Sequence, residues 1–360
     1  MQPDPNDENP IKAPDLDALK HRIRGWGAEL GFQQVGFADT ELAEAERHLN
    51  QWLAEGRHGD MEWMARHGRK RTRPAEFEPG TKSVIVARMD YLPADATPVE
   101  TLLGQPNKAC ISRYAIGRDY HKVLRARLKK LADRIAGEIG PFGFRVFTDS
   151  APVMEKPLAA KAGLGWIGKH TNLLDRRHGS WFFLGEIYTD LEFPPDRPVS
   201  DHCGSCRKCI DVCPTRAITA PYRLDARKCI SYLTIEHKGS IPVEFRAAIG
   251  NRVYGCDDCQ MVCPWNRYAQ FTAEDDFTPR ADLDAGSLVA LFGWSKETFL
   301  ARTEGTAIRR IGHERWLRNL AVGLGNAPTT PEVAAALEAR RRHPSPLVRE
   351  HVEWALAQHR

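Results

Sequence analysis

Cysteines are the residues of this 360-residue chain whose spacing most clearly points to chemistry. The run HCGSCRKCIDVCP places Cys203, Cys206, Cys209 and Cys213 in a C-x2-C-x2-C-x3-C pattern, followed directly by a proline. In a run of this spacing three thiolates bind one cubane iron–sulfur cluster, and the fourth binds a neighbouring cluster. The run therefore predicts two clusters.

The ligands for a second cluster lie further along the chain. The segment GCDDCQMVCP repeats the last three cysteines and the proline, and Cys229 supplies the missing ligand. Crossing the fourth cysteines predicts one cluster on Cys203, Cys206, Cys209 and Cys263, and the other on Cys213, Cys229, Cys256 and Cys259. Two zinc sites are the alternative, since thiolates bind either metal. Zinc does not explain the Cys-Pro pairs, and two adjacent clusters indicate electron transfer.

The remaining sequence must provide the elements that position these clusters. Apolar spacing predicts helices over 15–32 and 119–140, the second ended by Gly140 and Pro141. Runs of β-branched or aromatic residues predict strands over 81–91 and 180–191 and a strand that runs into a turn over 144–152. Three amphipathic helices follow over 313–326, 331–343 and 346–359. These last helices are similar to a HEAT-type repeat, and a plain helical cap is the alternative.

The pattern of elements predicts an α/β (α+β) fold in several domains. We expect a disordered tail over 1–14, a catalytic α/β domain over 15–198, a two-cluster ferredoxin-like domain over 199–270 and a helical domain over 271–360. Prolines at positions 194, 195 and 198 mark the end of the α/β domain.

Composition limits the location and the partners of the chain. No apolar run approaches the roughly 20 residues that span a bilayer, and the first residues are acidic and proline-rich, unlike a signal peptide. We therefore expect a cytoplasmic protein that does not bind a membrane. The net charge of +4 permits a polyanionic partner without requiring one. No G-x-G-x-x-G follows a predicted strand, which disfavours nicotinamide and leaves a flavin or a corrinoid as the electron acceptor.

Five segments together resemble the epoxyqueuosine reductase family, in the same order and over about residues 15 to 360. They are SRYAIGRDYHK (112–122), DSAPVMEKPLAAKAGLGWIGKHTNLL (149–174), the cysteine run at 203–214, CISYLTIEHKGSIP (229–242) and GNRVYGCDDCQMVCPWNRY (250–268). The resemblance implies a nitroreductase-like cofactor domain, two [4Fe-4S] clusters and cobalamin.

The same resemblance implies an activity. The enzyme would reduce epoxyqueuosine to queuosine at the wobble position of tRNAs with GUN anticodons, using electrons from an external low-potential donor, and it would act as a monomer. A corrinoid-dependent reductive dehalogenase-like reductase of a small molecule is the alternative enzyme. An electron-transfer or nucleic-acid-binding protein without chemistry of its own is the alternative from another class, and the roughly 200 residues before the clusters argue against it.

The resemblance also implies individual site residues. Asp149 would be the proton donor, and a helix cap is its alternative role. The string from Asp119 to Leu124 lacks the glycine of the D-x-H-x-x-G corrinoid signature, so a base-off cobalamin without an axial histidine is expected. The implied cobalamin contacts are Arg57, Asp149, His170, Asn172, Ser231, Cys256, Asp257 and Asp258.

Two basic segments and one cysteine complete the candidates. If tRNA is the substrate, the expected phosphate contacts are Arg69, Lys70, Arg71, Arg340, Arg341 and Arg342. A solvated charged face is the alternative for both segments. Cys110 lies outside the cluster set, and a lone thiol is usually a small buried hydrophobe, with a place in the cofactor pocket as the alternative.

Overall fold

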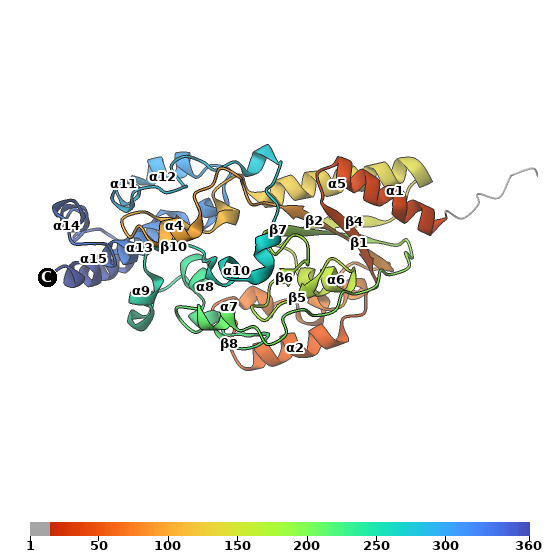
Figure 1. The fold of residues 1–360 in the computed structure, drawn as a ribbon, viewed down its shortest axis with the longest axis horizontal. Helices are drawn as coiled ribbons and strands as arrows, with labels where there is room; N and C mark the ends of the chain where they lie inside the picture. The colour runs from red at the N-terminus through yellow and green to blue at the C-terminus, as the bar shows by residue number, and fades with distance from the viewer. Residues whose placement is uncertain (1–14) are drawn as a thin grey trace, which may run out of the picture.

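A four-stranded antiparallel sheet lies at the centre of the α/β part of the chain (Figure 1). The computed structural model describes residues 15–360. The strand order is β1 (Gln34–Ala38), β2 (Ser83–Asp90), β7 (Phe182–Thr189) and β4 (Phe144–Phe147). Strands β2 and β7 pair along their whole length, and every residue of both is buried. Both faces of the sheet are therefore covered.

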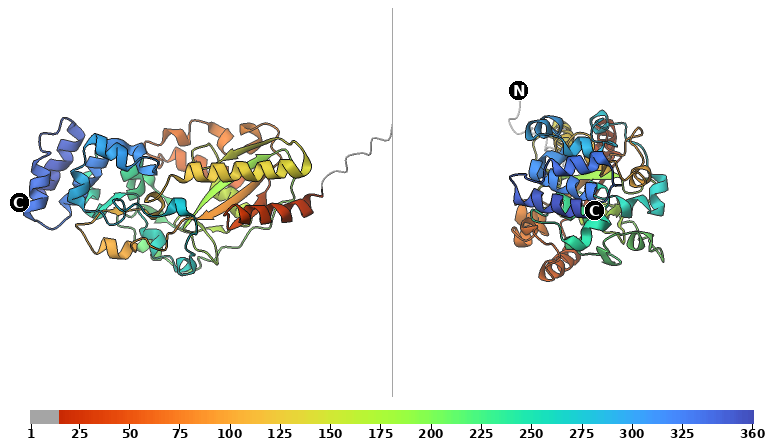
Figure 2. Two further views of the ribbon diagram at one scale, coloured as in Figure 1. Left: turned by 90° about the horizontal axis from the view of Figure 1, so that it is seen from above. Right: turned by 90° about the vertical axis from the view of Figure 1, so that its left-hand side faces the viewer.

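Alternation along β2 and β7 divides the core into two layers. On one face Ile85 and Phe183 pack with α1 (Leu16–Glu29) and α5 (Tyr120–Ile139), which lie side by side along the sheet (Figure 2). On the other face Val84, Val86 and Leu184 pack with α6 (Glu155–Lys161) and the hairpin of β5 (Trp166–Ile167) and β6 (Leu173–Leu174). The polar site described below takes Tyr120 and His121 from α5, on the first face, and Glu155 from α6, on the second.

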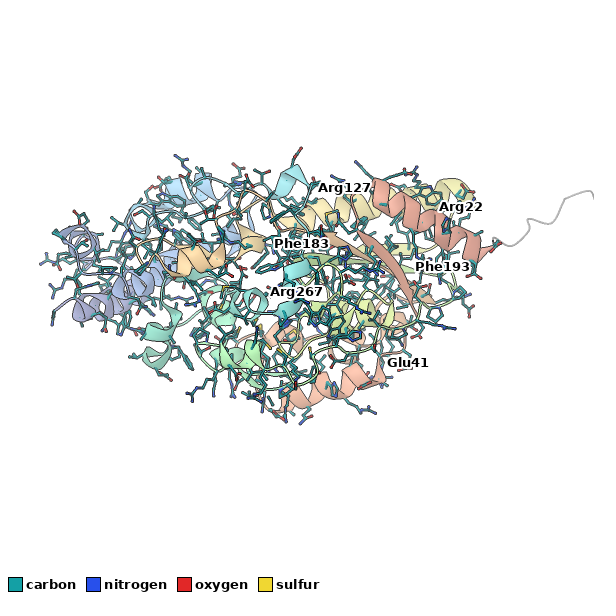
Figure 3. All side chains as sticks on the ribbon, in the orientation of Figure 1. Arg22, Glu41, Arg127, Phe183, Phe193 and Arg267 are labelled. Carbon is teal, nitrogen blue, oxygen red and sulfur yellow. The ribbon has the colours of Figure 1, made fainter. Side chains whose placement is uncertain are left out.

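Side chains also tie the outer helices together. Arg127 of α5 donates to the carbonyl oxygen of Leu30 at the end of α1 and pairs with Glu274 (Figure 3). Further short elements surround the sheet and connect it to the cysteine-rich region: α2 (Ala43–Ala54), α3 (Pro74–Phe77), α4 (Val99–Leu103), and the 3-10 helices η1 (Glu62–Met64), η2 (Gly68–Arg71) and η3 (Arg113–Ala115).

The cysteine-rich region consists of short helices and two-stranded ladders. Its elements are α7 (Lys208–Asp211), β8 (Ile218–Ala220), β9 (Arg223–Leu224), η4 (Ala226–Lys228), α8 (Ile230–Ile235), α9 (Val243–Ile249), β10 (Arg252–Tyr254), α10 (Asp258–Met261), η5 (Pro264–Tyr268) and η6 (Asp275–Phe277). Strand β10 pairs in parallel with β3 (Cys110–Ile111). This ladder joins the region to the earlier half of the chain.

The C-terminal helices form the end of the molecule opposite to α1 (Figure 1). They are α11 (Leu288–Phe292), α12 (Lys296–Arg302), η7 (Ala307–Ile311), α13 (Gly312–Gly325), α14 (Pro331–Glu338) and α15 (Pro346–Gln358). Their core also contains Ile111, Val253 and Tyr254, so it is continuous with the β3–β10 ladder. The domain boundaries and the HEAT-like description stay predictions.

Helix α13 is fixed to α8 by two fully buried polar side chains. The Arg318 guanidinium donates to the carbonyl oxygen of Leu233 at 2.7 Å, and the Asn319 amide donates to those of Thr234 and Val253, both at 2.8 Å. Because these groups are removed from water, each bond lost would leave a buried polar group unpaired.

The structure confirms a mixed α/β fold and the elements expected within residues 15–360. The helices expected over 15–32 and 119–140 are α1 and α5, and the strands expected over 81–91 and 180–191 are β2 and β7. The expected C-terminal helices are α13, α14 and α15. Strand β1 and helix α2 were not anticipated, and the tail expected over 1–14 lies outside the described residues. No helix within residues 15–360 is long and apolar enough to cross a membrane.

Candidate active site and cluster sites

Four of the cysteines line one cavity of about 200 Å³. Cys203, Cys206 and Cys209 come from the first run and Cys263 from the second, which is the crossed grouping expected for the first cluster. We call this group the first cluster site. His170 lines the same cavity, and burial together with the nearby Lys156 lowers the pKa of its imidazole to about 4. His170 is therefore neutral and lies beside the first cluster site.

We call the remaining four cysteines, Cys213, Cys229, Cys256 and Cys259, the second cluster site, as the crossed pairing predicts. Burial raises the pKa of Cys259, whose charged neighbours include Cys213 and Cys229. Burial also raises the pKa of Cys229, and the backbone N–H groups at the start of α8 act in the opposite direction. Among residues 15–360, no three His, Cys, Asp or Glu side chains converge closely enough to hold a single metal ion. A cubane, whose thiolates bind four separate irons, does not require such convergence.

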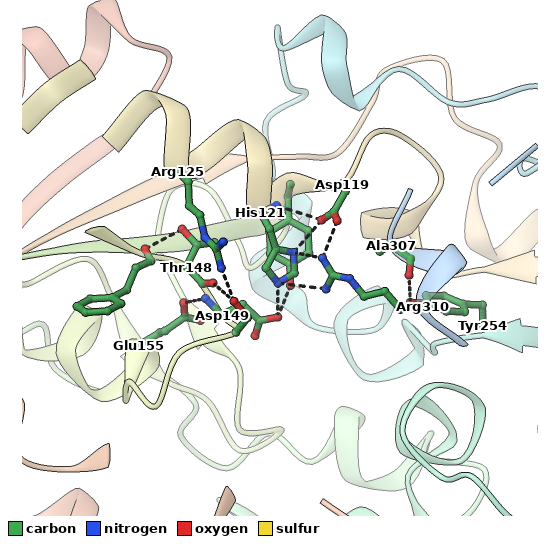
Figure 4. Close-up of polar contacts among 12 residues, drawn as sticks. Asp119, His121, Arg125, Thr148, Asp149, Glu155, Tyr254, Ala307 and Arg310 are labelled. Atoms are coloured by element: carbon green, nitrogen blue, oxygen red, sulfur yellow. Dashed lines mark hydrogen bonds and ion pairs between the residues drawn. The ribbon is translucent and has the colours of Figure 1, made fainter. Parts of the chain in front are cut away.

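A polar network centred on Asp149 connects the first turn of α5 with the loop that follows β4 (Figure 4). The Tyr120 hydroxyl donates to Asp149 Oδ2 at 2.6 Å, and His121 Nε2 lies 3.0 Å from the same oxygen. His121 Nδ1 lies 2.8 Å from Asp119 Oδ1, and Arg310 Nη2 donates to Asp119 Oδ2 at 2.5 Å. Four side chains thus hold a single carboxylate in place.

The positions in this network follow from local structure. Asp119 caps the N-terminus of α5, which puts Tyr120 and His121 in the first helical turn, where their side chains leave the helix together. Arg310 comes from η7, so the C-terminal part of the chain contributes directly to the site. Asp149 has a φ of 52°, a left-handed conformation that is strained for a residue other than glycine.

The pKa values of Asp149 and His121 are shifted in opposite directions by the network. Burial acts to raise the pKa of Asp149, but the hydrogen bonds from His121 and Tyr120 and the charges of His121 and Arg310 outweigh it, and the pKa lies below its usual value. The Asp149 side chain is 51% exposed, which agrees with a lowered rather than a raised pKa. Burial would lower the pKa of His121, but its bonds to Asp119 and Asp149 raise it. At neutral pH the proton therefore lies on the imidazole side of the His121–Asp149 pair.

Two further carboxyl groups adjoin Asp149. The Asp149 backbone N–H donates to Glu155 Oε1, which helps to hold the strained residue. Burial and the charge of Asp149 raise the pKa of Glu155 to about 8. Glu186 of β7 is 0% exposed, and neither of its oxygens has a hydrogen-bond partner among the described residues. Burial and the charges of Glu155 and Asp149 raise the pKa of Glu186 well above its ordinary value.

Lys156 lies between the Asp149 network and the second cluster site. Its Nζ donates to the carbonyl oxygen of Thr171 at 3.1 Å. Burial lowers the pKa of Lys156, and its charged neighbours are Glu155, Cys259, Asp149 and Cys229, in that order of effect. The acid network and the second cluster site are therefore close neighbours.

The residues of the network that adjoin Asp149 had no role in the sequence interpretation. Tyr120 and His121 were considered only within the corrinoid signature, and Glu155, Glu186 and Arg310 were not singled out. The pairing of Glu186 with Asp149 depends on the register of β7, and that of Arg310 on the packing of η7. Asp-Tyr-His at the start of a predicted helix was the one readable signal.

Several predicted cobalamin contacts have partners within the protein. Asp257 accepts from the Ser112 hydroxyl at 2.5 Å and from the backbone N–H of Arg113 at 2.8 Å. Asp258 forms a buried ion pair with Arg252 at 2.6 Å. Both carboxylates thus fasten β10 and α10 to neighbouring elements, and a cofactor contact in this structure would have to use their backbone.

The other predicted contacts surround the second cluster site. Arg57 donates to the Thr219 hydroxyl at 3.0 Å, and its backbone carbonyl accepts from the N–H of Ala226 in η4, just before Cys229. Asn172 Oδ1 accepts from Lys156 Nζ at 2.9 Å. Ser231 lies in the first turn of α8. Their contacts with cobalamin stay predictions.

The structure separates the arginines of the first basic segment. Arg69 and Lys70 are exposed, but Arg71 is 4% exposed and its guanidinium donates to the carbonyl oxygens of Met64 and Trp63. Arg69 and Lys70 could reach a phosphate, whereas the structure does not support a phosphate contact through Arg71.

The second basic segment shows the same division. Arg340 donates to the carbonyl oxygens of Phe292 and Trp294, both at 2.9 Å, and so joins α14 to α11. Arg341 and Arg342 are exposed. Cys110, outside both basic segments, is buried with Val99 and Leu102 as the sequence suggested for a small hydrophobe.

Two sets of four cysteines beside a network of acids and a histidine define an iron–sulfur oxidoreductase. Residues 202–266 match the family described as "4Fe-4S double cluster binding domain", and residues 71–150 match "Epoxyqueuosine reductase QueG, DUF1730". An epoxyqueuosine reductase of Pseudomonas aeruginosa is 61% identical over 360 residues, covering 100% of this chain and 99% of the relative. That of Escherichia coli is 57% identical over 344 residues, covering 96% and 90%. The chain belongs to the epoxyqueuosine reductase family.

Solved structures agree with this assignment. A crystal structure of epoxyqueuosine reductase with an epoxyqueuosine-modified tRNA-Tyr stem loop matches with a TM-score of 0.87 at 29% identity, covering 96% of this chain and 91% of that one. An epoxyqueuosine reductase from Bacillus subtilis, described with a catalytic aspartate loop swung out of the active site, matches with a TM-score of 0.84 at 28% identity, covering 96% and 91%.

Proposed function

We propose that this protein reduces epoxyqueuosine to queuosine at the wobble position of tRNAs with GUN anticodons, the last step of queuosine synthesis. The observation that carries the proposal is the position of the Asp149–His121 pair beside the second cluster site, in a chain whose family acts on this base. The Asp149–His121 pair can donate a proton close to the cluster site that would donate electrons.

The reaction requires both. Two electrons and two protons enter, the epoxide oxygen leaves as water, and the ring gains a double bond. Opening the epoxide leaves an alkoxide that an acid must protonate. His121, whose pKa is raised, donates its proton along the 3.0 Å contact to Asp149, and the half-exposed Asp149 carboxyl passes it to the substrate oxygen. Tyr120 and Arg310 keep the pair oriented.

Cobalamin is the proposed electron-accepting cofactor, and the donor set of the site fits its expected base-off form. Both ring nitrogens of His121 are engaged, by Asp119 and by Asp149, so this imidazole is not available as a cobalt ligand. When bound, cobalamin would supply the low-potential cobalt chemistry that reduces the epoxide. Lys156, Asn172, Ser231 and Arg57 would hold it near the second cluster site.

The electron donor, the cellular location and the tRNA contacts of the enzyme follow from the same proposal. An external low-potential donor would load the two clusters, and the enzyme would act on its tRNA in the cytoplasm, as a monomer. The exposed Arg69, Lys70, Arg341 and Arg342 would contact tRNA phosphates.

The test is conversion of epoxyqueuosine in tRNA by the reconstituted enzyme with cobalamin and a low-potential reductant, measured by mass spectrometry of the nucleosides. We expect Asp149→Asn to lower the single-turnover rate by about 100-fold or more, because general acid catalysis supplies about this factor. Asp133→Asn, on the exposed side of α5, is the control and should leave the rate unchanged. No queuosine from the wild type would refute the function, and full turnover by Asp149→Asn would refute the proton donor.

A further inference from the structure

Two buried ring N–H groups beside the first cluster site have no hydrogen-bond acceptor among the described residues. They are Nε2 of His170 and Nε1 of Trp166, in side chains that are 4% and 3% exposed. Neither atom has a hydrogen-bond partner in residues 15–360. A buried donor without an acceptor costs roughly 1 to 3 kcal/mol, so native proteins rarely leave one unpaired without a reason.

Both side chains are directed to the same place. His170 lines the cavity formed by the first cluster site. Trp166 packs in one apolar cluster with Cys263 and Cys203, and its ring meets that of Trp265 edge-on at 5.4 Å. Trp166 belongs to β5 and His170 to the turn that follows, so a single hairpin brings both N–H groups to the cysteines.

The surrounding backbone fixes which nitrogen of His170 carries the proton. The backbone N–H of Asn172 donates to His170 Nδ1 at 3.1 Å, so Nδ1 is the acceptor. A neutral imidazole with an acceptor Nδ1 carries its proton on Nε2. The hairpin therefore presents Nε2–H, a donor, to the cavity. Cluster sulfurs and cysteine thiolates are acceptors of the kind that such donors need.

We propose that His170 Nε2–H and Trp166 Nε1–H donate hydrogen bonds to the sulfurs at the first cluster site and thereby raise the reduction potential of that cluster. Reduction adds one electron to a cluster that is already anionic, and a donor hydrogen bond stabilises the more negative state. The two residues are positioning residues that act through the cluster. The inference does not depend on the substrate of the enzyme, since it concerns the step at which the cluster accepts an electron.

The ammonium group of Lys169, which lies between the two, does not provide these bonds, whereas its backbone N–H acts on the Cys203 thiol. Its Nζ donates to the carbonyl oxygen of Cys206 at 2.9 Å and to that of Gly204, so its donors hold the cysteine loop rather than the sulfurs. In this hairpin the Lys169 ammonium group holds the backbone of the cysteine loop, and the rings of His170 and Trp166 face the cluster site.

The test is a potentiometric titration of the reconstituted two-cluster protein, followed by electron paramagnetic resonance, with iron content measured for every variant. We expect His170→Leu to decrease the equilibrium constant for one-electron reduction of the first cluster by about tenfold, or about 59 mV. His170→Gln should recover most of the loss, because its amide places an N–H where Nε2 lies.

Trp166→Phe should shift the same potential in the same direction, and Trp316 provides the matched control. The indole nitrogen of Trp316 is also buried without a partner among the described residues, but it lies in the C-terminal core. Trp316→Phe removes the same N–H and should leave both cluster potentials unchanged. Equal potentials in His170→Leu and the wild type would overturn the proposal.

A measurement on the unmutated protein tests the proposal even if the variants fail to assemble their clusters. With histidine labelled by 15N, electron–nuclear double resonance of the reduced first cluster should show a nitrogen coupling and an exchangeable proton that disappears in D2O. The absence of both signals from a fully loaded protein would contradict a hydrogen bond from His170.

Discussion

Glu186→Gln should stabilise the protein, and by more at alkaline than at acidic pH. The Glu186 carboxyl is fully buried without a partner among the described residues, and Glu155 and Asp149 are the charged groups that face it. All three effects raise its folded-state pKa above the unfolded value. The folded state then binds a proton that the unfolded chain has released, so stability falls as the pH rises above the unfolded pKa.

The magnitude follows from this linkage. Each pH unit between the unfolded and the folded pKa costs about 1.4 kcal/mol, so the interval from about pH 5 to about pH 8 costs at most about 4 kcal/mol. Glu155 and Glu186 share the same pocket and relax together, and we therefore expect roughly 2 kcal/mol. Gln has the shape of a protonated Glu and does not titrate, so the variant avoids this cost.

The assay is urea unfolding of the anaerobically prepared protein at about pH 5 and about pH 8. We expect similar midpoints for Glu186→Gln and the wild type at the lower pH and a higher midpoint for the variant at the upper pH. Glu192→Gln, whose side chain is 80% exposed, is the control and should show no such dependence. A difference between Glu186→Gln and the wild type that is the same at both pH values would refute the reasoning.

Three further predictions concern other parts of the site. Arg310→Gln should lower turnover about tenfold, because it removes hydrogen bonds to charged groups worth about 1.5 kcal/mol. Arg309→Gln, which does not touch the network, should leave turnover unchanged. Equal turnover rates for Arg310→Gln and the wild type would contradict the role of Arg310. Asn319→Ala should lower the free energy of unfolding by about 3 kcal/mol, measured by urea, since two buried carbonyls lose their donor; a loss under about 1 kcal/mol would contradict it. Cys263→Ser should remove the first cluster and reduce the iron content from about eight to about four per chain, while Cys110→Ser should not; an iron content that stays near eight would contradict Cys263 as a cluster ligand.

The sequence predicted the elements with regular spacing and the cluster ligands well. Helix α5 has apolar residues at helical intervals over 20 residues and a glycine directly after its end, and both signals are local. The grouping of Cys263 with Cys203, Cys206 and Cys209 could be expected because the spacing of the two runs is itself the signal. Asp149 was proposed as the proton donor from resemblance, and this role stays a prediction.

What the sequence did not predict depends on contacts between distant segments. Glu186 looks like an ordinary polar position in a strand, and only the pairing of β7 with β2 and β4 buries it next to Glu155. Arg71 looks like one cation in a basic run, and only the fold of η1 and η2 turns it inward. Charge and spacing describe single segments, whereas burial is decided by the segments that cover them.

The C-terminal helices have a part in the site that their distance in sequence conceals. Arg310 directly precedes α13, and α13 is fixed by Arg318 and Asn319 to α8, the helix that follows Cys229. One helix therefore sets the position of an arginine in the acid network and of a ligand of the second cluster site. The proposed reaction needs a proton and electrons at one carbon–oxygen bond. The distance between the acid network and the second cluster site must therefore be constant. The buried polar bonds of α13 provide that constancy, and this explains why a part of the chain without cysteines is packed so closely against the part that carries them.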